Sequence, residues 1–360
     1  MRAKTGNAAI GLLFGLLFGL LATSPARAAQ SAPEPGPEAA PAPEAAASEP
    51  APPAFDLRGY RGARGLAPEN TLAGIDQALA VGVTTLALDI VATADDVLVA
   101  YAEPLLVPEI TRDPSGAYIE ERLPVRGLTL EELQRFDVGR IRPGTEYARA
   151  YAEQITRDRA RIPTLQAAFD RVAELEAHHV RFALDMRIRP DRPDLAPEPK
   201  DLAALVAALV RENGLEQRVV VESYDWRLLD ALAEIAPEIA RGCRTAEIAF
   251  DTLRAGEPGP SAWLNGRDID DFGGSAARAA ADAGCVVWAP DHRDLDLEAL
   301  EEARAHGLKV VPGLVNETAE MRRMLALGVD GLTTDFPNRL RALLVERGLP
   351  APPQVRIPTR

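Results

Sequence analysis

Residues 84–90 read TTLALDI, a short run of β-branched and apolar residues with an aspartate near its end. Runs of this length and composition are typical of buried β-strands. Seven similar runs lie along the chain, at residues 56–60, 181–187, 218–222, 239–244, 285–288, 308–314 and 331–334. Segments with helical periodicity alternate with them, including residues 70–80, 202–211, 226–235, 297–305 and 317–327. Eight strands alternating with helices over roughly 250 to 300 residues predict a (β/α)₈ TIM barrel, with an open doubly wound sheet as the alternative.

The stretch from residue 98 to residue 162 is too long for an ordinary connection between a strand and a helix. It is rich in arginine, proline and glycine. We therefore predict an insertion after the second strand. It should lie over the face where the strands end, which is where such barrels place their chemistry.

The first 54 residues differ in composition from the rest. Residues 1–28 carry two early basic residues, an apolar run and the small residues of Ala26-Arg27-Ala28, which together predict a cleaved signal peptide. Residues 29–54 consist almost entirely of proline, alanine and glutamate and predict a disordered linker. The folded domain is expected over 55–347, followed by a tail at 348–360. The protein is therefore expected to be exported to the periplasm or the exterior, with no stable transmembrane segment after cleavage.

The composition of the 360-residue chain excludes several classes of protein. A net charge of −14 and 5% aromatic residues argue against a nucleic-acid partner. Two cysteines and four histidines exclude a zinc finger or a disulfide-stapled fold. Cys243 lies late in one predicted strand and Cys285 early in the next. We expect two free buried thiols, with a disulfide as the alternative.

Several motifs follow the predicted strands in order. The sequence YRGARG stands at 60–65, APENT at 67–71, LALD at 86–89, AEP at 102–104, SYDW at 223–226, WAP at 288–290 and GVDGLTTDFP at 328–337. Together this ordered set, from Phe55 to about Leu344, resembles the glycerophosphodiester phosphodiesterase family.

The resemblance implies a TIM barrel and metal-dependent hydrolysis of glycerophosphodiesters to glycerol phosphate and an alcohol, a reaction of lipid metabolism. In the family the first strand ends His-Arg-Gly, the second carries Glu-x-Asp, a His-Asp-Pro follows, and the third ends Glu-x-Lys. The two histidines act as general acid and base, and the three carboxylates hold a divalent ion that polarises the phosphate.

This chain departs from the family pattern at the positions that the resemblance assigns to proton transfer and metal binding. Tyr60 and Ala102 stand where the two histidines are expected. Ala87 replaces the glutamate of the Glu-x-Asp pair. Asp185 replaces the glutamate before the third strand ends, and Arg187 replaces the lysine. Alanine transfers no proton and a phenol titrates near pH 10, so the acid-base machinery is missing.

A metal site remains conceivable. Asp89 and Asp185 could share Mg²⁺ or Ca²⁺, with Glu222 at the end of the next strand as a third ligand. Against this, we expect Glu222 to pair with Arg187 across adjacent strands, and the Arg187 guanidinium could occupy the place of the cation. We therefore expect cation binding to be weak or absent.

Three hypotheses follow for the function. The preferred one is a catalytically impaired family member, a pseudoenzyme that binds a phosphodiester or another small anionic ligand through Arg61 and Arg187. The second is a working phosphoric diester hydrolase with a rebuilt site that uses Tyr60 or His292 for proton transfer. The third is a structural or partner-binding role. The sequence leaves the oligomeric state open.

Overall fold

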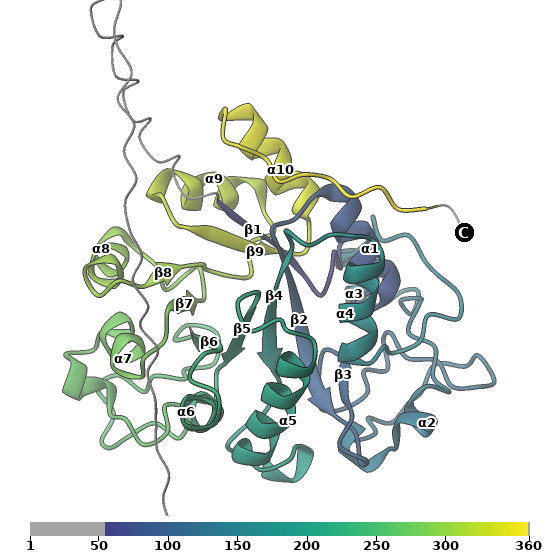
Figure 1. Ribbon diagram of the computed structural model, residues 1–360, viewed down its shortest axis with the longest axis horizontal. Helices are drawn as coiled ribbons and strands as arrows, with labels where there is room; N and C mark the ends of the chain where they lie inside the picture. Colours follow the sequence, from purple (N-terminus) through teal and green to yellow (C-terminus); the bar gives the residue numbers. More distant parts are fainter. Residues whose placement is uncertain (1–54, 359–360) are drawn as a thin grey trace, which may run out of the picture. The chain divides into compact units, whose positions relative to one another are not determined.

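A computed structural model describes residues 55–358, and its strands form a nearly closed barrel (Figure 1). Eight parallel strands follow one another in the order β8-β7-β6-β5-β4-β2-β1-β9. They are β1 (Asp56–Tyr60), β2 (Thr85–Ala92), β4 (Arg181–Met186), β5 (Val219–Ser223), β6 (Ala240–Thr245), β7 (Val287–Pro290), β8 (Lys309–Val310) and β9 (Gly331–Thr334). The predicted barrel is confirmed.

Hydrogen bonds between the backbones after β8 and around β9 bring the ends of the sheet together. The Thr333 N–H donates to the Pro312 carbonyl at 3.1 Å, and the Val315 N–H donates to the Thr333 carbonyl at 3.0 Å. The predicted strand at residues 308–314 is shortened to β8, although the Val311 and Gly313 N–H groups still donate to the Trp288 and Pro290 carbonyls of β7. Pro312 faces β9 and has no N–H to donate to it. The segment after β8 is therefore joined to β9 by individual hydrogen bonds instead of a full ladder.

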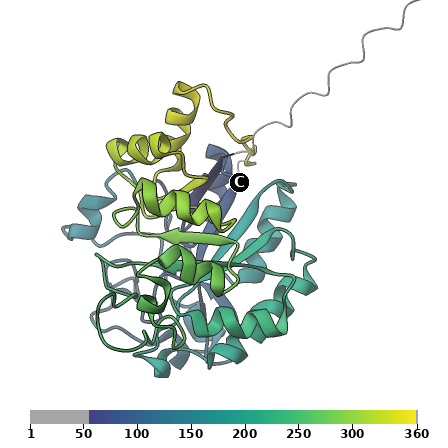
Figure 2. The ribbon, with the colours of Figure 1, turned by 90° about the vertical axis from the view of Figure 1, so that its left-hand side faces the viewer.

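Helices cover the outside of the barrel, as Figure 2 shows for the green to yellow C-terminal half. The helices outside the inserted region are α1 (Leu72–Val81), α4 (Leu165–Glu174), α5 (Pro199–Glu212), α6 (Trp226–Ile235), α7 (Ala276–Asp282), α8 (Leu297–Ala305), α9 (Thr318–Leu327) and α10 (Pro337–Glu346). Short 3₁₀ turns lie at Pro193–Leu195 and Ile269–Phe272. Side-chain caps begin several helices; the Thr71 hydroxyl, for example, accepts from the Gly74 N–H.

The predicted insertion is present and has an apolar core of its own. It contains β3 (Leu98–Ala100), which pairs antiparallel with β2, a 3₁₀ turn at Val125–Gly127, and the short helices α2 (Leu130–Leu133) and α3 (Glu146–Ala150). Tyr101, Leu106, Leu133 and Ile162 are among its buried residues. The separate core lets this region hold a defined position against the barrel.

The end of the chain packs against the barrel. The Val355 N–H donates to the Leu79 carbonyl of α1 at 2.9 Å, and the Gln354 amide donates to the Ala80 carbonyl at 3.0 Å. The predicted signal peptide and linker at 1–54 lie outside the described residues. Between residues 55 and 358, no helix has both the length and the apolar content needed to cross a membrane.

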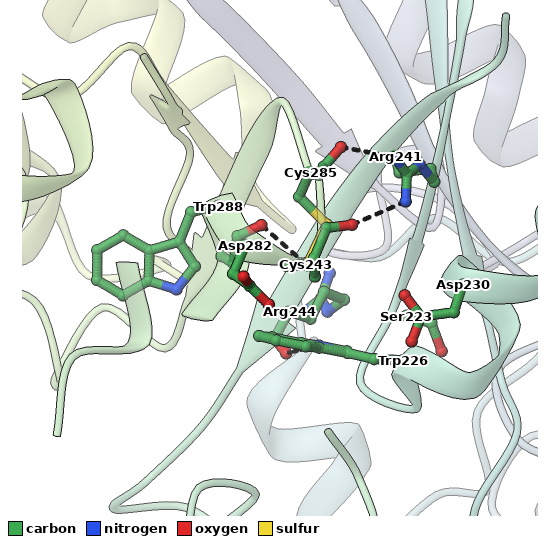
Figure 3. The surroundings of a disulfide bond; sticks show 12 residues. Ser223, Trp226, Asp230, Arg241, Cys243, Arg244, Asp282, Cys285 and Trp288 are labelled. Carbon is green, nitrogen blue, oxygen red and sulfur yellow. Dashed lines mark hydrogen bonds between the residues drawn. A yellow bond between two sulfur atoms is a disulfide. The ribbon is translucent and has the colours of Figure 1, made fainter. Parts of the chain in front are cut away.

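Cys243 and Cys285 form a disulfide with their Cα atoms 5.8 Å apart (Figure 3). The expectation of two free thiols is therefore wrong. Cys285 lies in the turn before β7 instead of inside the strand, and its N–H donates to the Ala280 carbonyl of α7 at 3.1 Å. The Cys243 sulfur lies 3.9 Å from the same carbonyl, so α7 holds both residues at one place.

The disulfide predicts a measurable contribution to stability. It closes a loop with a sequence separation of 42 residues. Restricting the unfolded chain by a loop of this size stabilises the native state by up to about 4 kcal/mol. The double variant Cys243→Ala/Cys285→Ala should lose about 2–4 kcal/mol of unfolding free energy in urea titrations under oxidising conditions. Reduced wild-type protein serves as the control and should lose a similar amount. A double variant as stable as the oxidised wild type would contradict the bond.

Candidate functional site

Three acidic residues lie side by side in the barrel because of the register of its strands. Asp89 on β2 is the pairing partner of Asp185 on β4, and Asp185 is the partner of Glu222 on β5. Residues paired in this way project to the same face of a sheet. All three are buried, so their negative charges require nearby cations or hydrogen-bond donors.

The loop after β1 brings Arg61 to this row of carboxylates. Arg61 adopts a left-handed backbone with φ +53°, and Gly62 follows at φ +82°. A Cβ on Gly62 would lie 2.6 Å from the backbone carbon of Gly74, so only glycine fits there. The Arg61 N–H donates to the Ala87 carbonyl at 2.6 Å, and its carbonyl accepts from the Asn70 N–H at 2.9 Å. The loop is thereby fixed at both ends.

Asp89 has several polar partners. Its carboxylate lies 2.5 Å from the Arg61 Nε and accepts a 3.1 Å hydrogen bond from the Tyr60 hydroxyl. Asn70 donates to the second oxygen at 3.4 Å, and its own amide oxygen accepts from the Asp89 N–H at 3.3 Å. Arg61 also pairs with Glu69 at 2.8 Å. Both oxygens of Asp89 are therefore engaged.

Asp185 lies between two arginines. Arg187 Nη1 contacts one of its oxygens at 3.1 Å, and Arg244 Nε lies 3.6 Å from the same oxygen. The other oxygen, Oδ1, is buried and has no hydrogen-bond partner within the described part of the chain. Burial raises the pKa of Asp185, and the two arginines only partly oppose this effect.

Glu222 pairs with Arg58 at 2.5 Å and with Arg244 at 3.4 Å. Arg58 comes from the middle of β1 and also holds Asp56 at 2.7 Å. The expected pair between Glu222 and Arg187 is wrong. Glu222 pairs with Arg58, and Arg187 contacts Asp185 and Glu103 instead. Gly242 on β6 makes room for Glu222, since a Cβ there would lie 2.7 Å from the Glu222 Cγ.

The three carboxylates do not fit a divalent cation. Asp89 and Glu222 have both oxygens bound to donors, and only Asp185 Oδ1 is unengaged. Between residues 55 and 358, no group of three or more His, Cys, Asp or Glu side chains is arranged to hold a metal ion. The guanidinium groups already supply the positive charge that a metal would bring.

Tyr60 and Ala102, which the resemblance predicts to stand where the family has histidines, carry no side chain that titrates near neutral pH. Burial raises the pKa of Tyr60 to about 12, with Arg61 opposing and Asp89 reinforcing the shift. Ala102 is buried and has no titratable group. His292, the weak alternative, lies beside Asp291 in the loop after β7, and its backbone carbonyl accepts from Arg323. Burial lowers the pKa of His292, and none of its described contacts reaches the carboxylates.

The insertion covers one side of the barrel mouth. The Tyr147 hydroxyl of α3 donates to Glu69, and the Tyr151 hydroxyl donates to Asp335 at 3.3 Å. Asp335 also pairs with Arg64 at 2.6 Å. These contacts tie the insertion to the loops after β1 and β9, as the predicted position over the strand ends requires.

Comparisons with known proteins agree with this architecture. The model of the Glycerophosphoryl diester phosphodiesterase family matches residues 61–339. The chain belongs to this family. The structure of a Silicibacter pomeroyi protein assigned to the same class is 32% identical, with a TM-score of 0.74 over 83% of this chain and 95% of that one.

More distant family members match over a similar range. A glycerophosphodiester phosphodiesterase from Caldanaerobacter subterraneus is 24% identical over 293 residues, which cover 80% of this chain and 97% of the relative. An Oleispira antarctica phosphodiesterase, solved with the product sn-glycerol-3-phosphate, has 19% identity and a TM-score of 0.58 over 80% of this chain and 96% of that one. This last likeness supports the fold alone.

Sequence reasoning missed the residues that neutralise the carboxylates. Arg58 stands two residues before Tyr60 on β1, and Arg244 stands two residues after Gly242 on β6. Since alternate strand residues share a face, both could have been placed in the barrel interior from sequence. Glu69 lies in the APENT motif at 67–71, whereas no comparable signal pointed to Tyr147, which reaches the site from the insertion.

The network predicts that Arg58 is essential for stability. Arg58→Met leaves Glu222 and Asp56 buried without their main partner, which should lower the unfolding free energy by about 3–5 kcal/mol. The matched control is Arg135→Met, whose ion pair with Glu131 is exposed and should change stability by less than about 1 kcal/mol. Equal losses in the two variants would contradict the role of Arg58.

The pH dependence of the same variants gives a second test. Burial alone would raise the pKa of Asp56, but Arg58, Arg181 and two threonine hydroxyls outweigh it and lower that pKa. The resulting stability is present above the ordinary carboxyl pKa and is lost as pH falls through the depressed folded value. The difference in unfolding free energy between wild type and Arg58→Met should therefore become smaller as the pH falls. Urea titrations at several pH values measure this difference. A gap that stays constant or widens would contradict this coupling.

Proposed function

We propose that this chain is a glycerophosphoryl diester phosphodiesterase family barrel that has lost hydrolysis and binds a small anionic ligand at its mouth. The observation that carries the proposal is the pairing of Asp89, Asp185 and Glu222 with buried arginines. A site neutralised in this way does not fit the divalent ion that the family chemistry implies.

The two residues at the expected histidine positions, Tyr60 and Ala102, support the same conclusion. Tyr60 stays protonated at neutral pH because of its raised pKa, and its hydroxyl is already committed to Asp89. Ala102 offers no replacement. General acid-base assistance is worth about 10²–10⁴-fold in rate, so the loss of both partners removes a large part of the family's catalytic power.

Arg187 is the residue best placed to bind the anion. Its side chain is 20% exposed and lines a cavity of about 460 Å³ beside the ends of β4 and β5. Arg61, the other predicted phosphate ligand, is enclosed between Asp89 and Glu69. It therefore acts on the anion mainly by long-range electrostatic attraction and not by direct contact. A guanidinium group bonds phosphate oxygens well, and Arg187 needs only to release Glu103, which it holds at 3.3 Å.

The proposal includes export of the protein. The predicted signal peptide at residues 1–28 is one reason. The Cys243–Cys285 disulfide is another, because such bonds persist in oxidising compartments.

Hydrolysis assays test the proposed loss of activity. Unmodified protein incubated with glycerophosphocholine or glycerophosphoethanolamine and added Mg²⁺ or Ca²⁺ should release no glycerol phosphate above the rate without enzyme. The matched variant Tyr60→His/Ala87→Glu/Ala102→His restores the family residues, and activity gained only there would support the proposal. Turnover by the unmodified protein that disappears with EDTA would overturn it and favour a rebuilt active site.

Anion binding is tested separately by calorimetric titration with inorganic phosphate and glycerol 3-phosphate. We expect the same affinity with and without EDTA, because arginine supplies the positive charge. Strict dependence on a divalent ion would contradict this part of the proposal.

A further inference from the structure

The cavity next to Arg187 combines positive charge with an aromatic wall. Its lining includes two arginines, Arg187 and Arg189, and three aromatic residues, Tyr224, Phe250 and Trp263. The aromatic residues come from the loops after β5 and β6, two connections that the hydrolytic chemistry of the family does not explain here. We propose that the ligand is an amphiphilic anion, with a phosphate or similar head and a flat aromatic or acyl group. This inference rests on the proposed anion binding and specifies its ligand class.

The positive side of the cavity is accessible to a ligand. Arg189 pairs with Asp191 at 2.8 Å, but both side chains are at least half exposed, and exposed pairs contribute little stability. The Arg189 guanidinium also lies 5.8 Å from the centre of the Trp263 ring, which orients it. The acidic residues of the lining, Glu103 and Asp191, are more exposed than Arg187. The charged part of the lining thus consists of two arginines and two carboxylates, and Arg187 is the least exposed of the four.

The apolar side is built from aromatic rings that contact one another. The Tyr224 and Phe250 rings are 4.9 Å apart edge to face, and the Phe250 and Trp263 rings are 6.1 Å apart. Phe250 is nevertheless 49% exposed, and Ile248 nearby in the same loop is 64% exposed. Large apolar side chains left open at the edge of a cavity gain free energy when a ligand covers them.

The two sides together select the ligand class. Inorganic phosphate would satisfy the arginines but leave the rings exposed, and a neutral apolar compound would leave the arginines without an added partner. A ligand with both parts uses the whole cavity. An aryl phosphate and a short-chain acyl glycerol phosphate share this chemistry, and the relative affinity for the two identifies which source fits.

The test compares four probes by calorimetry: inorganic phosphate, glycerol 3-phosphate, phenyl phosphate and hexanoyl glycerol phosphate below its micelle concentration. We expect at least one of the two amphiphiles to bind about tenfold tighter than glycerol 3-phosphate, because it buries the aromatic wall. If both phosphate and glycerol 3-phosphate bind but neither amphiphile binds tighter, the inference fails and the proposed anion binding stands. If none of the four probes binds, both fail.

Variants assign the effect to the cavity. Phe250→Ala should reduce the affinity for the preferred amphiphile severalfold and leave that for glycerol 3-phosphate unchanged, whereas Arg189→Ala should weaken both. The matched controls are Leu297→Ala, an exposed apolar residue outside the cavity lining, and Arg293→Ala, which makes the same type of pair with a carboxylate two residues away. Both controls should bind like wild type. An unchanged preference in Phe250→Ala, with thermal melting showing a folded protein, would overturn the inference.

Discussion

Charges buried inside a barrel must be matched by opposite charges at close range, and this requirement organises the centre of the protein. The register of β2, β4 and β5 places Asp89, Asp185 and Glu222 next to one another. Without compensation, three adjacent carboxylates in a low-dielectric interior would repel strongly or become protonated. Arginines from four different segments meet them, so each side chain depends on its neighbours for its position. The resulting chain of ion pairs runs through Asp56, Arg58, Glu222, Arg244, Asp185, Arg187 and Glu103.

This arrangement compensates the carboxylates with fixed cations. A bound metal can polarise a phosphate oxygen and can leave, whereas a guanidinium bonded to carboxylates remains in place and accepts no electron pair. In this chain the positive charges beside the carboxylates are therefore arginine side chains held in place by ion pairs. Tyr60 belongs to the same polar network, since its hydroxyl donates to Asp89.

The surrounding elements decide where a ligand can approach. The insertion closes the side of the mouth near β1 and β9 through Tyr147 and Tyr151. The side near β4, β5 and β6 stays open and holds the cavity with Arg187 and the aromatic wall. The Cys243–Cys285 disulfide joins β6 to the turn before β7. The connection after β6, which carries Phe250 and Trp263, therefore begins at a cross-linked strand.

The sequence by itself determined the barrel, the inserted region and the family, because strand-and-helix alternation and ordered motifs depend on local residue patterns. It also predicted that Tyr60 and Ala102 stand where the resemblance implies histidines, and it brought Asp89, Asp185 and Glu222 into consideration through their places at strand ends. Only the tertiary structure decided which cation meets which carboxylate, because register and side-chain reach across the barrel join residues far apart, such as Arg58 and Glu222. The same holds for the disulfide, since the exact start of β7 determines whether Cys285 can reach Cys243.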